Sequence, residues 1–194
     1  MGKHRVVLIN GAPGVGKSWL ADRILEWRHK HHMPTVRVGF NDGLKKAVGA
    51  IVGLDLFNEE VYVRFKQTVF ADGKTGRDWM ITISEESKKF KYDIWVDRFI
   101  DRVTQHHSTN VLVVNDSFGF PVEYHRLLAD EQLETLNVYI DEGNGHTMAM
   151  QTEGDYRQFK GDSRFDLSRH CSIRAANSTA AFEAVKTALI NRNW

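Results

Sequence analysis

The most constraining feature of this chain lies near its start, where an apolar run at residues 6–9 leads into a glycine-rich loop. Residues 11–18 read GAPGVGKS, a complete match to the pattern G-x-x-x-x-G-K-[ST]. A helical pattern of apolar residues follows over residues 17–30. In this context, glycines let successive backbone N–H groups point into one concavity, which binds phosphate oxygens. We therefore expect a phosphate-binding loop; the alternative is a glycine-rich turn that binds nothing.

The residue types of the loop predict how a nucleotide would be held. The Lys17 side chain is expected to reach the β- and γ-phosphates, and the Ser18 hydroxyl to bind Mg²⁺. The N-terminus of the helix adds its dipole and its backbone donors. ATP and Mg²⁺ are therefore the expected cofactors. The residues expected to contact the nucleotide are Gly11, Gly14, Val15, Gly16, Lys17, Ser18, Trp19 and, near a base, Asn177.

Length and charge limit the classes of protein to consider. At 194 residues the chain is most simply one domain with room for a buried core. A formal net charge of +1 gives no global electrostatic argument for binding nucleic acid or an anionic membrane. The single Cys171 excludes an internal disulfide and fits a reducing compartment. Because no apolar run approaches transmembrane length, we expect a soluble cytoplasmic protein without a membrane partner.

Apolar runs alternate with helical patterns along the chain, which predicts an α/β fold with parallel strands. Beyond residues 6–10, the expected strands are 35–40, 110–114, 136–140 and, more weakly, 172–174. The expected helices are 17–30, 44–52, 59–70, 77–90, 92–107, 121–129 and 179–191, with a strand left open for 59–70. The expected core stripe of the central helices is Trp79, Ile81, Ile83, Ile94, Trp95, Phe99, Ile100 and Val103.

A helical segment of about residues 44–107 separates the second and third expected strands and is too long for a simple crossover. Ligands of open α/β sheets bind outside the carboxyl ends of the strands. Asp42 and Lys45 follow such an end, so we expect them to meet a second substrate, with a helix N-cap as the other role for Asp42. Arg77 is expected either to contact a phosphate or to lie on a solvated helix face. The full set of substrate candidates is Phe40, Asp42, Lys45, Arg77, Trp79 and Arg98.

Two further segments carry expected catalytic groups. Asp116 follows the third strand, where a carboxylate that binds Mg²⁺ or its water is expected, with a turn-forming Asp as the alternative. Residues 143–169 are polar and rich in arginine, which fits a lid that closes over phosphates, or else a long surface loop. Arg157 and Arg164 in that lid are expected to stabilise charge on a transferred phosphoryl group. Together with Lys17 and Asp116 they form the expected catalytic set.

Several segments, in this order, resemble the bacteriophage deoxynucleoside monophosphate kinases. After the loop of residues 11–18 these segments are Phe40-x-Asp42-x-Leu44-Lys45, Gly76-Arg77-Asp78-Trp79, Asp93-Ile94-Trp95-Val96, Asp116 and Gly161-Asp162-Ser163-Arg164. This chain departs from the family pattern at Gly43, where the family often has proline. It also departs at residues 116–123, where the family often has an arginine.

The resemblance implies a single P-loop kinase domain with a three-layer fold and a five-stranded parallel sheet whose central strand precedes the loop. Its core would comprise residues 1–43 and 108–194, its acceptor-binding insertion about 44–107, and its lid about 143–169. It implies transfer of the γ-phosphoryl group of ATP to a deoxynucleoside monophosphate, giving the diphosphate, in the cytoplasm of a phage-infected host cell. The partner would be a small nucleotide, and a homodimer remains one option for its oligomeric state.

Two other functions remain alternatives. The same chemistry could act on a modified base in phage DNA, such as hydroxymethyluracil, because a shared fold does not decide the acceptor. The near-neutral charge and the lack of a basic stripe favour a free nucleotide over DNA. The other alternative is a GTPase switch, since residues 116–119 spell D-x-x-G. However, the chain lacks an Asn-Lys-x-Asp segment to recognise guanine.

Overall fold

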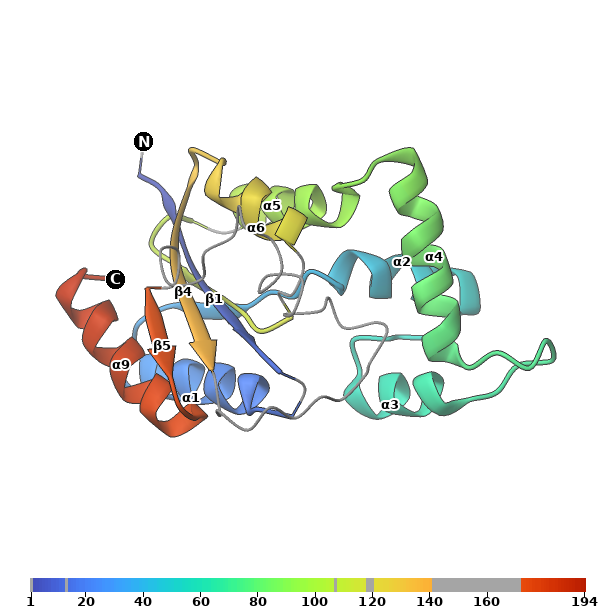
Figure 1. The fold of residues 1–194 in the computed structure, drawn as a ribbon, viewed down its shortest axis with the longest axis horizontal. Coiled ribbons are helices and arrows are strands. Elements are labelled where there is room, and N and C mark those ends of the chain that lie inside the picture. The colour runs from blue at the N-terminus through green and yellow to red at the C-terminus, as the bar shows by residue number, and fades with distance from the viewer. Residues whose placement is uncertain (1, 13, 107, 118–120, 141–171) are drawn as a thin grey trace. The chain divides into compact units, whose positions relative to one another are not determined.

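The computed structural model describes residues 2–12, 14–106, 108–117, 121–140 and 172–194. It divides into two compact units (Figure 1). The first unit comprises Met1–Gly39 with Ile100–Trp194, and the second comprises Phe40–Phe99. Each unit has its own cluster of buried apolar side chains. Among the described residues, none of the helices combines the length and apolarity needed to cross a membrane.

The first unit is built on a parallel sheet of five strands in the order β2-β3-β1-β4-β5. The strands are β1 (His4–Gly11), β2 (Thr35–Arg37), β3 (Leu112–Asn115), β4 (Leu133–Ile140) and β5 (Ile173–Ala175). The central strand β1 is buried from Val6 onward, as expected for a continuous apolar run covered on both faces. The prediction of an α/β fold with a five-stranded parallel sheet and the first strand in its centre is confirmed.

The boundaries of all five strands differ from those predicted, by the largest margin in β2 and β4. The strand expected at residues 35–40 ends at Arg37, although the N–H of Val38 still donates to the carbonyl of Val114 at 3.0 Å. The strand expected at 136–140 begins earlier, at Leu133, because β4 pairs with β1 along its whole length. The length of a strand depends on how far it pairs with its neighbours in the sheet. Apolar patterns in the sequence do not show where that pairing ends.

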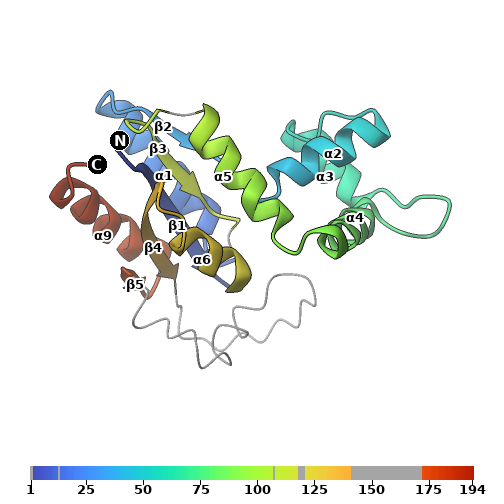
Figure 2. The same ribbon diagram turned by 90° about the horizontal axis from the view of Figure 1, so that it is seen from above.

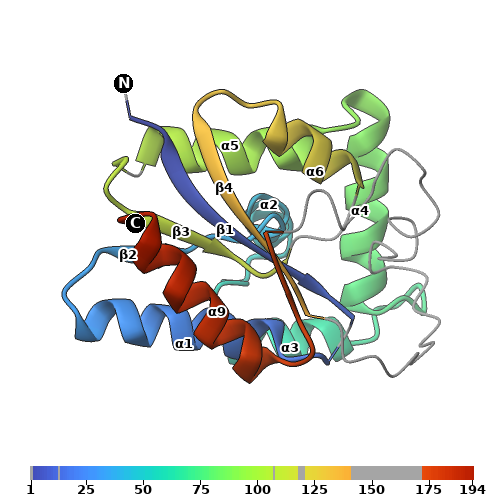
Figure 3. The same ribbon diagram turned by 60° about the vertical axis from the view of Figure 1, so that its left-hand side comes forward.

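Helices cover both faces of this sheet, as Figure 3 shows. On one face α1 (Lys17–Lys30) lies beside α9 (Ser178–Asn191), and their buried side chains join those of β1 in one core. On the other face lie α6 (Pro121–Leu128) and the end of α5 (Ile94–His106). This arrangement is compatible with a three-layer α/β fold.

A buried arginine ties α1 to the end of the chain. The Arg28 side chain is 2% exposed and donates to the backbone oxygen of Trp194 and, at 3.0 Å, to the hydroxyl of Thr35. Burial lowers the pKa of the Arg28 guanidinium, and the nearby charge of Arg5 lowers it further. A buried guanidinium needs such acceptors, so these bonds hold α1, β2 and the last residue together.

The second unit consists of α2 (Asp42–Val52), α3 (Glu59–Gln67), α4 (Gly76–Phe90) and the beginning of α5, seen from above in Figure 2. Helix α4 begins with a capping box, in which the Thr75 hydroxyl accepts from the Asp78 N–H and the Asp78 carboxylate accepts from the Thr75 N–H. The small core of this unit is Leu44, Val48, Leu56, Phe65 and Met80.

Two predictions for this unit are corrected. The helix expected at 59–70 ends at Gln67, because Val69 pairs with Thr75 in an isolated antiparallel bridge that reverses the chain. Trp79 was expected in the core but is 36% exposed, and Met80 is buried in its place. Phe99 is buried as predicted, and so are Ile100 and Val103, which belong to the first unit. The remaining members of the expected stripe, Ile81, Ile83, Ile94 and Trp95, are partly buried.

Candidate functional site

The glycine-rich loop connects the carboxyl end of β1 to α1. Gly14 and Gly16 have φ angles of 77° and 89°, which favour glycine. At Gly11 the φ angle is 153°, and a Cβ there would lie 2.8 Å from the carbonyl oxygen of Ile140. A Cβ on Gly16 would lie 2.9 Å from the Ser178 hydroxyl. The glycines of the motif are therefore required by backbone angle, by close packing, or by both.

The Lys17 side chain folds back over this loop. Its ammonium donates to the carbonyl oxygens of Gly11 at 2.8 Å and Ala12 at 2.9 Å. The start of the loop is held in turn by the buried side chain of Asn10, which accepts from the Gly11 N–H at 2.6 Å. A positive charge therefore lies directly above the loop backbone, where it would attract an anion.

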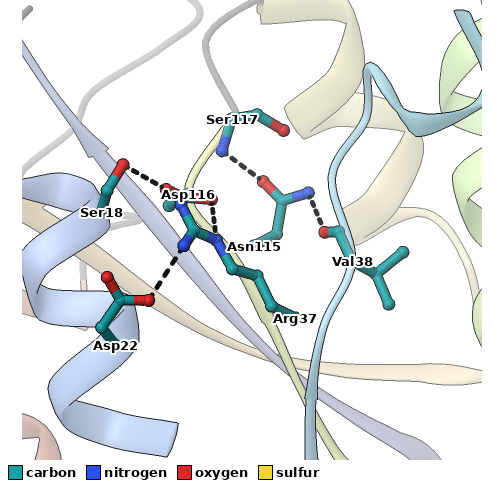
Figure 4. Close-up of polar contacts among 7 residues, drawn as sticks. All are labelled: Ser18, Asp22, Arg37, Val38, Asn115, Asp116 and Ser117. Atoms are coloured by element: carbon teal, nitrogen blue, oxygen red, sulfur yellow. Dashed lines mark hydrogen bonds and ion pairs between the residues drawn. The ribbon is translucent and has the colours of Figure 1, made fainter. Parts of the chain in front are cut away.

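Ser18 and Asp116, the two predicted metal ligands, meet in the structure (Figure 4). The Ser18 hydroxyl donates to Oδ2 of Asp116 at 2.8 Å, although the two residues are 98 positions apart. The Asp116 side chain is only 9% exposed. The adjacent Asn115 is fully buried and donates to the carbonyl of Val38 at 2.8 Å, while its side-chain oxygen accepts from the Ser117 N–H. These bonds fix the end of β3 and thereby the position of Asp116.

Sequence reasoning missed two members of this network, Arg37 and Asp22. Arg37 donates from Nε to Oδ1 of Asp116 at 3.0 Å and from Nη2 to Oδ2, so one guanidinium holds both carboxylate oxygens. Its Nη1 donates to Oδ1 of Asp22 at 3.0 Å. Two signals point to these residues: Arg37 is a charge inside a predicted strand, and Asp22 lies one helical turn after Ser18. We call Ser18, Asp22, Arg37 and Asp116 the Asp116 network.

The oxygen atoms of Ser18 and Asp116 are of the type that Mg²⁺ binds. A serine hydroxyl and a carboxylate are hard oxygen ligands, and Mg²⁺ typically takes one or two carboxylates together with water and phosphate oxygens. In the part of the chain that the structure describes, no group of three or more His, Cys, Asp or Glu side chains forms a cage for a metal. Ser18 and Asp116 would supply two such oxygens, and water or the phosphate oxygens of a nucleotide would complement them.

In the second unit, cationic side chains gather around Tyr62 of α3. The Lys45 and Lys66 ammonium groups lie 4.2 and 4.4 Å from the centre of its ring. Burial raises the pKa of the Tyr62 hydroxyl, whereas the charge of Arg77 and a hydrogen bond with Asn41 act in the opposite direction. Lys45 and Arg77 were predicted to bind substrate, but Tyr62 and Lys66 were not. We call Lys45, Tyr62, Lys66 and Arg77 the Tyr62 cluster. It combines an aromatic face with basic groups from three helices.

The other predicted substrate residues of this unit have different surroundings. Phe40 is buried and packs on Phe99, with ring centres 4.5 Å apart. The exposed Trp79 ring lies 5.1 Å from the Lys74 ammonium. Arg98 is exposed, and its Cβ is 3.5 Å from where a Cβ on Gly43 would lie.

For Asp42, the N-cap interpretation is wrong. Asn41 occupies the N-cap position of α2, and Asp42 is the first residue of that helix. A carboxylate in the first turn still interacts favourably with the helix dipole. A substrate role for Asp42 stays a prediction.

The remaining nucleotide candidates lie in or near the loop. Val15 is buried, whereas Gly14 is exposed and Trp19 is 43% exposed. Asn177 is the N-cap of α9, and its side-chain oxygen accepts from the Ala180 N–H at 2.8 Å. Arg157, Arg164 and the rest of the predicted lid lie outside the described residues, as does Cys171.

Comparison with models of protein families finds none that matches this chain, and comparison with curated proteins finds no match either. The class that the structure itself defines is an α/β protein with a five-stranded parallel sheet. Its functional assignment therefore depends on the residues described above.

Proposed function

We propose that this protein is an ATP-dependent kinase that transfers the γ-phosphoryl group of ATP to a deoxynucleoside monophosphate, giving the diphosphate. The single observation that carries the proposal is the hydrogen bond from Ser18 to Asp116 beside a glycine loop overlaid by Lys17. These groups meet at the carboxyl ends of β1 and β3, where open parallel sheets bind ligands. The loop, the cation and the oxygen pair together suit a magnesium–nucleotide complex.

In the proposed donor site each group has a distinct role. The backbone N–H groups of residues 14–18, at the start of α1, would bind phosphate oxygens. Lys17 would leave the two carbonyls that it now contacts and bind the terminal phosphates. Ser18 and Asp116, which share a hydrogen bond, would hold Mg²⁺. Mg²⁺ when bound neutralises charge on the β- and γ-phosphates.

The Tyr62 cluster supports an anionic acceptor in the second unit. Lys45, Lys66 and Arg77 supply positive charge for a phosphate monoester, and Tyr62 supplies an aromatic surface. A phosphate acceptor is already nucleophilic, so positioning and charge stabilisation carry the reaction and no strong general base is needed. Asp42, Trp79 and Arg98 stay proposed acceptor contacts, and Arg157 and Arg164 stay proposed to stabilise the transferring group.

The test is an ADP-release assay with ATP and Mg²⁺ against ribo- and deoxynucleoside monophosphates, including hydroxymethylated pyrimidines. Turnover that depends on one or a few deoxynucleotides would support the proposal and identify the substrate. The matched control is Lys17→Ala, which should lack that turnover. Absence of acceptor-dependent turnover, with ATP still bound, would overturn the assignment to free nucleotides. Incubation with hydroxymethylated DNA would then test the alternative acceptor.

A further inference from the structure

The Arg37 guanidinium lies between two carboxylates at the proposed metal site. It holds both oxygens of Asp116 through Nε and Nη2, and it holds Asp22 through Nη1 at 3.0 Å (Figure 4). Ser18 donates to the same Asp116 carboxylate. Asp116 therefore already has a cationic partner at the place where the proposed function requires a divalent cation.

We propose that Arg37 neutralises Asp116 until Mg²⁺ arrives with the nucleotide, and that it then releases Asp116 while staying attached to Asp22. Arg37 would thus act as a positioning residue that sets how much Mg²⁺ the site requires. This inference rests on the proposed function, because it assumes that the site binds a magnesium–nucleotide complex.

Burial explains why Asp116 needs a partner at all times. Its side chain is 9% exposed, and a nearly buried carboxylate without a counter-charge is strongly unfavourable. Mg²⁺ supplies such a charge only when it is bound. When Mg²⁺ is absent, Arg37 supplies the positive charge through a bidentate contact that favours the ionised carboxylate.

Charge also explains why Arg37 must leave. A guanidinium on both oxygens of Asp116 and a divalent cation beside them would repel each other at close range. Asp22 offers Arg37 a second position, since its side chain is 58% exposed and lies on α1. Arg37 itself is 36% exposed, so its guanidinium can turn towards Asp22 and solvent without crossing the core.

The proposal makes opposite predictions for ATP with and without magnesium. In Arg37→Gln, ATP without Mg²⁺ should bind about tenfold more weakly, because Asp116 then faces the phosphates without a counter-ion. The affinity for ATP at saturating Mg²⁺ should stay within about twofold, and the Mg²⁺ concentration for half-saturation should fall, because the competing cation is gone. Calorimetric titration with ATP in EDTA and across a Mg²⁺ series measures all three.

Three matched variants accompany Arg37→Gln. Arg23→Gln removes a cation from α1, next to Asp22 in sequence, where Arg23 pairs with Glu26. This variant should change neither of the two ATP affinities nor the Mg²⁺ concentration for half-saturation. Asp22→Asn removes the second position for Arg37 and should raise the Mg²⁺ concentration needed. Arg37→Lys keeps the charge but cannot hold both carboxylates, so its Mg²⁺ requirement should fall between wild type and Arg37→Gln.

The outcomes separate this inference from the proposed function. If ATP binds more weakly to Arg37→Gln by the same factor with and without Mg²⁺, Arg37 is a fixed orienting group and the exchange is wrong. Unchanged binding in both conditions overturns it as well. If wild-type protein fails to bind ATP under any condition, the proposed function itself fails. Circular dichroism of each variant shows whether it is folded, and Arg37→Lys supplies the comparison if Arg37→Gln is not.

Discussion

Arg37 and Asp116 are 79 positions apart, yet Nε of Arg37 donates to Oδ1 of Asp116 at 3.0 Å. The contact arises because β2 pairs with β3, which sets Arg37 opposite Val114, two residues before Asp116. Helix α1 adds Ser18 and Asp22 from the side of the glycine loop. Three segments that are remote in sequence thus build one charged network, and that network carries the proposed magnesium chemistry.

Replacing Lys17 by alanine should lower turnover about 100-fold or more, while the KM for the acceptor changes little. The reason is that Lys17 is proposed to stabilise charge that develops on the transferring group, which affects kcat more than acceptor binding. Steady-state kinetics with varied acceptor checks this. Lys30→Ala, at the other end of α1 and exposed, is the control and should behave as wild type. Wild-type turnover in Lys17→Ala would remove Lys17 from the mechanism.

Ser18→Ala and Ser18→Thr should differ sharply in turnover and in the Mg²⁺ concentration that they require. Alanine removes the hydroxyl that donates to Asp116 and is proposed to hold the metal, so turnover should fall and the Mg²⁺ requirement should rise. Threonine keeps the hydroxyl, so Ser18→Thr should retain most of the turnover and a Mg²⁺ requirement close to that of wild type. Turnover measured across a Mg²⁺ series distinguishes the two variants. Equal behaviour of Ala and Thr would mean that the hydroxyl takes no part in binding the metal.

Lys66→Met should raise the KM for the acceptor about tenfold with a small change in kcat. Lys66 lies 4.4 Å from the Tyr62 ring and adds charge where the acceptor phosphate is proposed to bind, so its loss removes binding energy rather than transition-state stabilisation. Acceptor titrations at saturating ATP provide the measurement. Lys46→Met changes an exposed lysine of α2 and is the control. An unchanged KM in Lys66→Met would exclude the Tyr62 cluster as the acceptor site.

Gly76→Ala should destabilise the second unit by about 3 kcal/mol, because its Cβ would lie 2.1 Å from the carbonyl oxygen of Phe65. Backbone on both sides must move to relieve that overlap. Gly73→Ala is the comparison: its φ is 78° but no atom lies within 4 Å of an added Cβ, so the cost should be about 1 kcal/mol. Urea unfolding followed by circular dichroism tests the order, and equal losses would contradict the packing argument.

Because of the capping box of α4, the free energy of unfolding should fall as the solution becomes acidic. Hydrogen bonds from the Thr75 side chain and backbone lower the pKa of Asp78 below its ordinary value of 3.8. Since the folded pKa is depressed, the stabilisation is complete above the ordinary pKa and is lost as pH falls through the lowered value. Thermal melts between pH 2 and 6 should therefore show a smaller acid loss in Asp78→Asn than in wild type. Equal pH profiles for the two proteins would show that Asp78 does not contribute.

Much of the fold was predictable because the spacing of apolar residues over a short stretch of sequence indicates a strand or a helix. The run at residues 6–9 predicted a buried central strand, and that strand pairs on both sides in the sheet. Helix α1 spans residues 17–30 as expected, since the glycine loop, the apolar spacing and Pro34 set its ends. Trp79 was misplaced because α4 buries Met80, its neighbour, and helical spacing in a short window does not decide between adjacent faces.

The candidate site divides in the same way. The motif of residues 11–18 and the carboxylate of Asp116 could be identified from residue type and position alone, because their chemistry is local to the ends of elements. Arg37, Asp22, Tyr62 and Lys66 could not, because nothing in the neighbouring sequence shows which distant group each side chain meets. Phosphate binding by the loop and kinase activity stay predictions.

The sequence by itself determined the α/β class, the parallel sheet and the glycine loop, since backbone propensity and apolar periodicity act over a few residues. Only the tertiary structure decided that β2 lies against β3 and that Arg37 therefore meets Asp116. Strand pairing depends on the packing free energy of the whole sheet, which no single segment encodes. The counter-ion of the proposed metal ligand is a consequence of that packing.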